Sequence, residues 1–158
     1  MEAILVKDQK AAAFVMEDGT FEGVYRITEK VCGDVEQVTG VRPKIIKWQG
    51  ALQPAQVYVA TLGNSEMSEA IAEEEGIELS SLCGKRECFL FQVLKNGSLL
   101  IAGSDKRGTI YGLFHISELM GVSPFVHFAD VVPAPQKEII FSEKDSMQSK
   151  EPSVKYRG

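Results

Sequence analysis

Residues 99–120 read LLIAGSDKRGTIYGLFHISELM, which is an apolar run, a polar loop and an amphipathic segment in direct succession. The run at 99–102 has the length and apolar character of a buried strand. The loop is bracketed by glycines, and Ser104 or Asp105 in it can cap the unpaired amides at the start of a helix. Asp105 also suits the positive end of a helix dipole. We therefore predict a strand that leads through this loop into a helix over residues 106–120.

A glycine-rich loop between a strand and a helix is also the setting of a phosphate-binding loop, whose pattern is G-x-x-x-x-G-K-[ST]. Gly103 and Gly108 have the spacing of the two glycines in that pattern. Thr109 stands at the position of the lysine, however, and Ile110 stands at that of the hydroxyl residue. The dinucleotide-binding pattern G-x-G-x-x-G is not present either. The spacing argues against nucleotide binding, and we expect no cofactor.

Lys106 and Arg107 stand at the positive end of the predicted helix, where each cation costs on the order of a few tenths of a kcal/mol or more. Two interpretations remain open. Either both side chains extend into water, or an acidic partner or ligand meets them in the working molecule. Gly108 and Gly112 would let the helix lie close to a sheet or a neighbouring domain. The residues expected on its apolar face are Ile110, Leu113, Phe114, Ser117 and Met120, with Ile116 along the edge.

Strand patterns precede this segment along the chain. Asn96-Gly97 separates the apolar segments 87–94 and 99–102, and Asn-Gly between strand patterns is a strong hairpin signal. Four further strands are expected from short apolar runs bounded by turn residues, at 3–7, 11–16, 44–48 and 56–61.

A long helix is expected over residues 20–39. Residues 18–20, Asp-Gly-Thr, supply turn and capping chemistry, and Gly40 ends the pattern. Its apolar stripe recurs at steps of three and four, at Phe21, Val24, Ile27, Val31, Val35 and Val38. This periodicity is that of an amphipathic helix, and its valines are poor helix formers in isolation, so packing against a sheet must hold it.

A shorter acidic helix is expected over residues 66–75, capped by Gly-Asn-Ser at 63–65 and ended by Gly76. Together these patterns predict one domain of the α/β (α+β) class. We expect a mixed sheet of about five to seven strands, with the two main helices, 20–39 and 106–120, packed on it by their apolar stripes.

The chain has 158 residues, 44% of them hydrophobic and 25% charged, which fits one globular domain. A net charge of −5 offers no basic field to a nucleic acid. No apolar run reaches 18 residues, so no membrane span is expected. The first residues, MEAILVKDQK, lack the base and the apolar length of a signal peptide. We expect a cytoplasmic protein as the sequence stands, or a secreted or periplasmic one if a leader has been removed.

Cysteine and histidine do not form a metal-binding pattern. Cys83 and Cys88 flank a Gly-Lys-Arg turn, and no second cluster completes a zinc site. With Cys32 they are expected to be buried or half-buried thiols in a reducing compartment. His115 and His127 lack ligand spacing and are expected to be structural. We predict no metal site.

Two blocks of the sequence, IAGSDKRGTIYGLFHISELMGVSPFVHFADVVP (101–133) and EPSVKYRG (151–158), resemble the N-terminal region of glycoside hydrolase family 115. The enzymes of this family are xylan α-1,2-glucuronidases, which remove glucuronic or 4-O-methylglucuronic acid from xylan. The resemblance implies an α/β domain similar to the second domain of chitobiase and β-hexosaminidases. It also implies a (β/α)₈ barrel that follows this domain and carries the catalytic pocket.

The resemblance divides the chain into an N-terminal domain, 1–141, and a polar linker, 142–158, that leads toward a missing catalytic barrel. Glycoside hydrolysis needs two carboxylates held across the scissile bond. The resemblance places them in the barrel, so no catalytic residue is assigned here. The expected partners are the barrel of the same parent protein and acidic xylan side chains. The candidate binding or interface residues are Ser104, Asp105, Lys106 and Arg107.

Three classes of function compete. The first is a non-catalytic N-terminal module of a glucuronidase-like hydrolase, and the second is a free-standing binding module for acidic sugars or another anion that uses Lys106 and Arg107. The third is an independent small enzyme, for which the sequence shows no constellation of nucleophile, base or metal ligands. We predict the first, because it accounts for the family resemblance, and we expect this chain to be inactive by itself.

Overall fold

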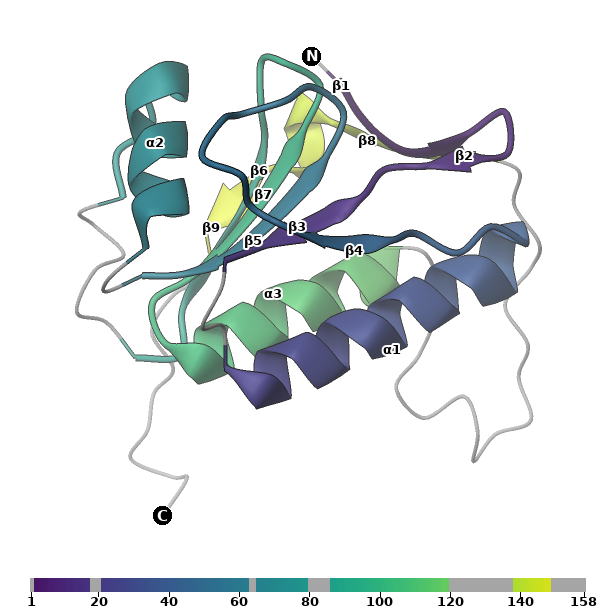
Figure 1. The fold of residues 1–158 in the computed structure, drawn as a ribbon, viewed down its shortest axis with the longest axis horizontal. Helices are drawn as coiled ribbons and strands as arrows, with labels where there is room; N and C mark the ends of the chain where they lie inside the picture. Colours follow the sequence, from purple (N-terminus) through teal and green to yellow (C-terminus); the bar gives the residue numbers. More distant parts are fainter. Residues whose placement is uncertain (1, 18–20, 63–64, 80–85, 120–137, 149–158) are drawn as a thin grey trace.

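The computed structural model describes residues 2–17, 21–62, 65–79, 86–119 and 138–148. A six-stranded mixed sheet has the strand order β4-β3-β5-β7-β6-β9 (Figure 1). Its strands are β3 (Phe14–Met16), β4 (Ile45–Lys47), β5 (Val57–Thr61), β6 (Phe89–Val93), β7 (Leu99–Gly103) and β9 (Met147–Gln148). A three-stranded antiparallel sheet, β2-β1-β8, consists of β1 (Glu2–Lys7), β2 (Lys10–Ala11) and β8 (Ile139–Ser142). The predicted α/β class is confirmed, and the small second sheet was not anticipated.

Strands β4, β3, β5 and β7 pair in parallel. Strand β6 pairs antiparallel with β7, and β9 pairs antiparallel with β6 at the edge of the sheet. Parallel neighbours need crossover connections. Helix α1 (Glu22–Thr39) connects β3 to β4, α2 (Glu66–Glu75) follows β5, and α3 (Lys106–Leu119) follows β7. Figure 1 shows α1 and α3 side by side along one face of the six-stranded sheet, with α2 on its other side.

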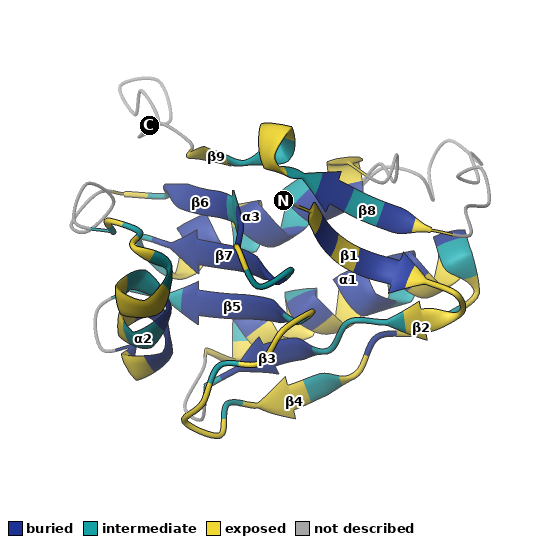
Figure 2. Cartoon of the chain, turned by 90° about the horizontal axis from the view of Figure 1, so that it is seen from above, coloured by how far each residue is buried: buried dark blue, intermediate teal, exposed yellow. Residues whose placement is uncertain are grey.

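Two hydrophobic cores lie on the two faces of this sheet, because successive side chains of a strand point to opposite faces. In β5, Val57 and Val59 belong to the core under α1 and α3, whereas Tyr58 and Ala60 belong to the core under α2. The helices contribute Val24, Val31, Cys32, Val35, Val38, Leu113 and Ile116 to the first core. Figure 2 shows β7 buried along its whole length and β5 buried up to its last residue, Thr61.

The predicted hairpin around Asn96-Gly97 is present as β6 and β7. These strands pair antiparallel from Phe89 opposite Gly103 to Val93 opposite Leu99. Gly97 has a φ of 84°, which is the left-handed conformation that the turn requires.

The strand predicted over residues 11–16 is wrong as one element. Its first residue belongs to β2 in the small sheet, and its last three form β3 in the large one. Ala12 donates its backbone N–H to Leu5 at 2.8 Å, whereas Phe14 donates to Lys44 at 2.8 Å. The chain therefore changes hydrogen-bonding partners at Ala13 and passes from one sheet to the other. Nothing in an uninterrupted apolar run signals such a change.

The helix ends follow the predicted cap chemistry. Gly40 and Gly76 end α1 and α2 in the left-handed conformation, with φ of 81° and 67°. Ser65 is the N-cap of α2, and its hydroxyl accepts the backbone N–H of Ser68 at 3.0 Å. The capping residues predicted at 18–20, and the first two at 63–64, lie outside the described residues.

Two details of the predicted apolar faces are corrected. Phe21 is 51% exposed, because it is the N-cap residue of α1 and precedes the buried stripe. In α3, Ile110 and Phe114 are only partly buried, and Met120 lies outside the described residues. The buried residues of α3 are Gly108, Thr109, Gly112, Leu113, Ile116 and Ser117. The glycine side of α3 thus faces the protein interior, which rotates the helix away from the predicted orientation.

The part of the predicted linker that the structure describes packs on the domain. A short 3₁₀ helix, η1 (Glu143–Asp145), follows β8, and β9 then pairs antiparallel with β6. The domain boundary between residues 141 and 142 remains a prediction. Within the described ranges, no helix combines the length and the apolar character needed to cross a membrane.

Candidate functional site

Three parallel strands, β3, β5 and β7, end at the same edge of the large sheet, and the three helices begin there. The connections from β3 and β5 diverge, because α1 leads to β4 on one side of the sheet and α2 leads to β6 on the other. In doubly wound sheets, ligands bind in the crevice at such a switch point. This edge is therefore where the fold favours a functional site.

Glu17 fills the switch point itself. The Ser65 hydroxyl donates a hydrogen bond to the Glu17 carboxylate, and the backbone N–H of Met67 donates to it at 3.3 Å. A helix N-terminus attracts anions through its unpaired amides and its dipole. Here the protein's own carboxylate occupies that position at the start of α2. The sequence reasoning missed Glu17, since a single acidic residue after a strand carries no distinctive signal.

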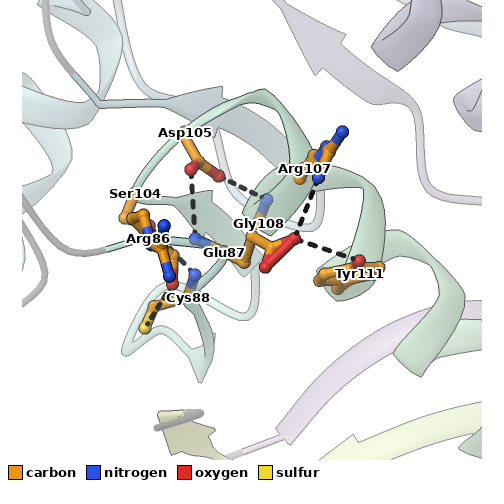
Figure 3. Close-up of polar contacts among 8 residues, drawn as sticks. All are labelled: Arg86, Glu87, Cys88, Ser104, Asp105, Arg107, Gly108 and Tyr111. Atoms are coloured by element: carbon orange, nitrogen blue, oxygen red, sulfur yellow. Dashed lines mark hydrogen bonds and ion pairs between the residues drawn. The ribbon is translucent and has the colours of Figure 1, made fainter. Parts of the chain in front are cut away.

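Three of the predicted site residues, Ser104, Asp105 and Arg107, lie at the start of α3 and contact Glu87 and Cys88, which directly precede β6 (Figure 3). Asp105 accepts the backbone N–H of Gly108 at 2.8 Å through one carboxylate oxygen, and that of Glu87 at 3.0 Å through the other. Ser104 exchanges two hydrogen bonds with the backbone of Cys88, at 3.0 and 2.8 Å. Asp105 is thus the cap of α3, and Ser104 fixes the loop to β6.

Arg107 meets a carboxylate of this chain, that of Glu87. The distance from Arg107 Nη1 to Glu87 Oε1 is 3.3 Å, and the Tyr111 hydroxyl donates to the same oxygen at 3.5 Å (Figure 3). The Glu87 side chain is only 10% exposed, whereas that of Arg107 is 75% exposed. Glu87 has a φ of 54°, which non-glycine residues rarely adopt. The sequence reasoning missed Glu87, because its partners lie about twenty residues away.

Lys106 differs from Arg107. Its side chain lies over the first turn of α1, since a Cβ added at Gly23 would come within 2.8 Å of Lys106 Cε and 3.1 Å of Nζ. Lys106 is exposed, and it makes no ion pair with any residue that the structure describes. The structure brings Ser104, Asp105 and Arg107 into one network and leaves Lys106 outside it.

The glycines of this region permit close packing, as predicted. A Cβ at Gly108 would lie 2.0 Å from the carbonyl oxygen of Cys88, and one at Gly112 would lie 2.6 Å from Ile101 Cγ2. No real Cβ tolerates such distances. The start of α3 is therefore pressed directly onto β6 and β7, and the neighbour that the glycines accommodate is the sheet.

The carboxylates of this site are committed to structure, because Asp105 caps a helix and Glu87 receives Arg107 and Tyr111. Within the described residues, no three acidic, cysteine or histidine side chains gather as metal ligands. Cys32 is buried, which raises its pKa to about 11, and the nearby Arg42 guanidinium lowers it less. Cys83 lies outside the described residues. The described residues of this arrangement offer hydrogen-bond donors and acceptors and the positive charges of Lys106 and Arg107.

His115 has the structural role that was predicted. Its ring packs edge-on against Phe91 at a centroid distance of 5.0 Å and lies 5.6 Å from Phe89. Burial lowers the pKa of His115 below its usual value of 6.5, while Glu118 and Asp145 oppose this effect. His127 lies outside the described residues.

No protein-family model and no curated protein matches the sequence. Solved structures do. A family GH115 4-O-methyl-α-glucuronidase with specificity for decorated arabinogalactans has a TM-score of 0.71 and 28% identity, over 93% of this chain and 18% of that one. A second protein, CpGH84D, has a TM-score of 0.53 and 13% identity, over 89% of this chain and 21% of that one.

The chain resembles one part of a GH115 glycoside hydrolase. This finding confirms the resemblance that the blocks at 101–133 and 151–158 predicted. The match to CpGH84D, at 13% identity, shows the fold alone. The chain spans about a fifth of the length of either protein, so it is comparable with one domain of a much larger hydrolase.

Proposed function

We propose that this chain is the non-catalytic N-terminal domain of a glycoside hydrolase similar to the GH115 α-glucuronidases. In this proposal it supports an adjacent (β/α)₈ catalytic domain of the same parent protein. The observation that carries the proposal is the 28% identity and TM-score of 0.71 over 93% of this chain, against only 18% of the GH115 enzyme. The commitment of Asp105 and Glu87 to local hydrogen bonds agrees with a supporting role.

The proposed substrate of the parent enzyme is a polysaccharide that carries α-linked glucuronic or 4-O-methylglucuronic acid. The resemblance in the sequence points to glucuronoxylan, whereas the GH115 structure is described as specific for decorated arabinogalactans. Both substrates would present the same anionic sugar on different backbones. We propose glucuronoxylan and use arabinogalactan as the comparison.

The proposed domain comprises residues 1–141, and residues 142–158 are proposed to lead toward the catalytic domain. The loop at residues 104–107 is proposed to face that domain. Two features support this placement. The loop lies at the edge of the sheet where the fold favours a functional site, and both Lys106 and Arg107 are exposed there.

The activity test compares this chain with the full-length protein that contains it. Purified residues 1–158 should release no uronic acid from glucuronoxylan or from decorated arabinogalactan, whereas the full-length protein should release it from one of them. Release by the 158-residue chain that is lost in Glu87→Gln or Asp105→Asn would overturn the non-catalytic role. A full-length protein without uronic acid release would overturn the proposed parent activity.

A second candidate is a free-standing module that binds acidic sugars or another anion. The observation that favours it is that Lys106 is exposed and has no acidic partner among the described residues. A titration of the 158-residue chain with glucuronate, monitored by NMR, distinguishes the binding module from the supporting domain. Saturable shifts of the amides at 104–108 that vanish in Lys106→Ala would support the binding module. Their absence would favour the supporting domain.

A further inference from the structure

Glu87, Arg107 and Tyr111 bring an acceptor, a donor and an aromatic ring to one place. Arg107 and Tyr111 lie one turn apart on α3, and both contact the Glu87 carboxylate (Figure 3). The Glu87 side chain is 10% exposed, that of Arg107 is 75% exposed, and Tyr111 is 37% exposed. We call these three residues the Glu87 cluster. It places a nearly buried carboxylate beside two exposed side chains.

The Glu87 carboxylate uses only one of its oxygens within the described chain. Oε1 accepts both contacts, at 3.3 Å from Arg107 Nη1 and at 3.5 Å from the Tyr111 hydroxyl. Both are long, because hydrogen bonds to a carboxylate usually measure about 2.5–2.9 Å. Oε2 accepts no hydrogen bond from any residue that the structure describes.

This unpaired oxygen is also accessible from outside the protein. Among the described residues, Trp48 Nε1 is the one fully buried side-chain nitrogen or oxygen atom without a hydrogen bond, so Oε2 is not sealed in the interior. Buried polar groups are nearly always hydrogen-bonded, and each exception requires an explanation. A carboxylate that is nine-tenths buried and has one unpaired, accessible oxygen indicates a donor from a ligand.

The two exposed members of the cluster also have free binding capacity. A guanidinium carries several N–H donors, and Arg107 uses Nη1 alone among them for a described partner, which is Glu87. The Tyr111 ring makes no ring contact with another described aromatic residue. One face of the cluster can therefore supply N–H donors and an aromatic surface at the same time.

The fold positions the Glu87 carboxylate before any ligand arrives. Asp105 accepts the backbone N–H of Glu87 at 3.0 Å, and Glu87 has a φ of 54°. A non-glycine residue keeps such a conformation only where the surrounding structure holds it, and these residues concentrate at functional sites. A carboxylate fixed in this way loses little conformational entropy on binding.

A sugar acid fits this combination of groups. A sugar hydroxyl donates to a carboxylate oxygen, and the C–H groups on one face of a pyranose ring pack on an aromatic ring. The carboxylate of a uronic acid pairs with the planar fork of an arginine. We propose that the Glu87 cluster binds a uronic acid residue of a polysaccharide. A sugar hydroxyl lies on Glu87 Oε2, the sugar carboxylate on Arg107, and one face of the ring on Tyr111.

The choice of a uronic acid rests on the proposed function, and the site adds a substrate contact outside the catalytic domain. It also distinguishes the two cations at the start of α3. Arg107 belongs to the sugar site, whereas Lys106 is exposed and lies over Gly23, outside the cluster. The free-standing anion-binding module would use Lys106 instead, so substitution of Lys106 separates the two sites.

An NMR titration of the 158-residue chain with methyl α-glucuronoside tests the sugar site. Saturable amide shifts are expected at residues 86–88 and 104–111. Glu87→Gln should raise the Kd about tenfold, because a neutral amide replaces the charged acceptor. Tyr111→Ala should also weaken binding, whereas Tyr111→Phe keeps the ring and should weaken it less. The matched control is Lys106→Ala, which removes a neighbouring cation and should leave the Kd and the shifts unchanged.

The role of Arg107 is tested with a second sugar, methyl α-glucoside, which lacks the carboxylate. It should bind the wild-type chain about tenfold more weakly than the glucuronoside, because the charge-assisted hydrogen bonds to Arg107 are lost. In Arg107→Gln the two sugars should bind equally. Acetate at the same concentration supplies a carboxylate without a sugar ring, and it should not reproduce the saturable shifts.

The absence of saturable shifts with the glucuronoside would overturn the sugar site, and so would shifts that acetate reproduces. Equal losses of affinity in Lys106→Ala and Glu87→Gln would also reject it, since net charge alone would then attract the sugar. Tyr111→Ala could lower the melting temperature of the full-length protein and leave that of the 158-residue chain unchanged. An adjacent domain would then pack on Tyr111 in place of a sugar.

Failure of the proposed function is read separately, from uronic acid release by the full-length wild-type protein. Binding of the glucuronoside to the Glu87 cluster, in a protein that releases no uronic acid, would sustain the sugar site and reject the parent activity. Release without binding at the cluster would reject the sugar site and sustain the parent activity.

Discussion

The carboxylate of Asp105 accepts the backbone N–H of Glu87 at 3.0 Å, although eighteen residues separate the two along the chain. Its other oxygen accepts the N–H of Gly108 at 2.8 Å and caps α3. One side chain therefore joins the start of α3 to the segment that enters β6. This link holds Glu87 where its carboxylate receives Arg107 and Tyr111.

Replacement of Asp105 should destabilise the domain more than the loss of an ordinary cap. Asp105→Ala removes both hydrogen bonds and should lower the free energy of unfolding by about 2 kcal/mol. Asp105→Asn keeps one acceptor oxygen and should cost less than the alanine variant. Urea unfolding of the 158-residue chain gives both values. Equal stability of Asp105→Ala and wild type would show that the link contributes nothing.

Gly108 should not tolerate alanine, because the new Cβ would lie 2.0 Å from the carbonyl oxygen of Cys88. Gly108→Ala should lower the free energy of unfolding by about 3 kcal/mol, since α3 must move off the sheet. Gly33 is the matched control, as it lies within α1 and its added Cβ would come no closer than 3.4 Å to Arg42. Gly33→Ala should stabilise the protein by up to about 1 kcal/mol, because alanine is the better helix former. Thermal unfolding that ranks the two variants in the opposite order would contradict the packing of α3.

Lys106 and Arg107 should contribute little to the stability of the 158-residue chain. Lys106→Ala should change the free energy of unfolding by less than about 0.5 kcal/mol. Arg107→Ala breaks the ion pair with Glu87, and it should cost no more than about 1 kcal/mol because the Arg107 side chain is 75% exposed to solvent. The double variant of the full-length protein should nevertheless lose domain coupling or activity. Unchanged melting temperature together with unchanged kcat/KM in that variant would refute the interface role of the loop.

His115 should make stability depend on pH near neutrality. Burial lowers its pKa in the folded state below 6.5, so the fold favours the neutral imidazole. The corresponding stability is present above the pKa of the unfolded chain and is lost as pH falls through that value toward the lower folded pKa. His115→Gln removes this contribution and should flatten the decline between about pH 7 and pH 5. Denaturant unfolding at several pH values measures the free energy of unfolding for both proteins. Parallel pH dependences of this free energy in the variant and the wild type would exclude the effect of His115.

The local elements could be predicted because their signals are local. Asn96-Gly97 gives the β6–β7 hairpin, Ser65 caps α2, and Gly40 and Gly76 end their helices in the left-handed conformation. Each signal depends on the backbone preferences or the short side-chain reach of the residue itself. No distant part of the chain is needed to produce them.

Glu17 and Glu87 could not be predicted, because each is an ordinary acidic residue whose partners come from other elements. Glu17 binds Ser65 and Met67 about fifty residues away, and Glu87 binds Arg107 at a separation of twenty. Only the parallel pairing of β3 with β5 and the antiparallel pairing of β6 with β7 bring these groups together. The spacing of these residues along the sequence does not indicate either contact.

The sequence by itself determined the strand, loop and helix over residues 99–119, the lack of a phosphate-binding spacing in that loop, and the resemblance to GH115. The tertiary structure decided that residues 11–16 divide between two sheets and that the glycine side of α3 packs on the sheet of its own domain. It also decided that Arg107 has an acidic partner in the domain while Lys106 lies over α1. The physical reason is that backbone propensity and cap chemistry act within a few residues, whereas packing and charge pairing depend on neighbours that only the folded chain supplies.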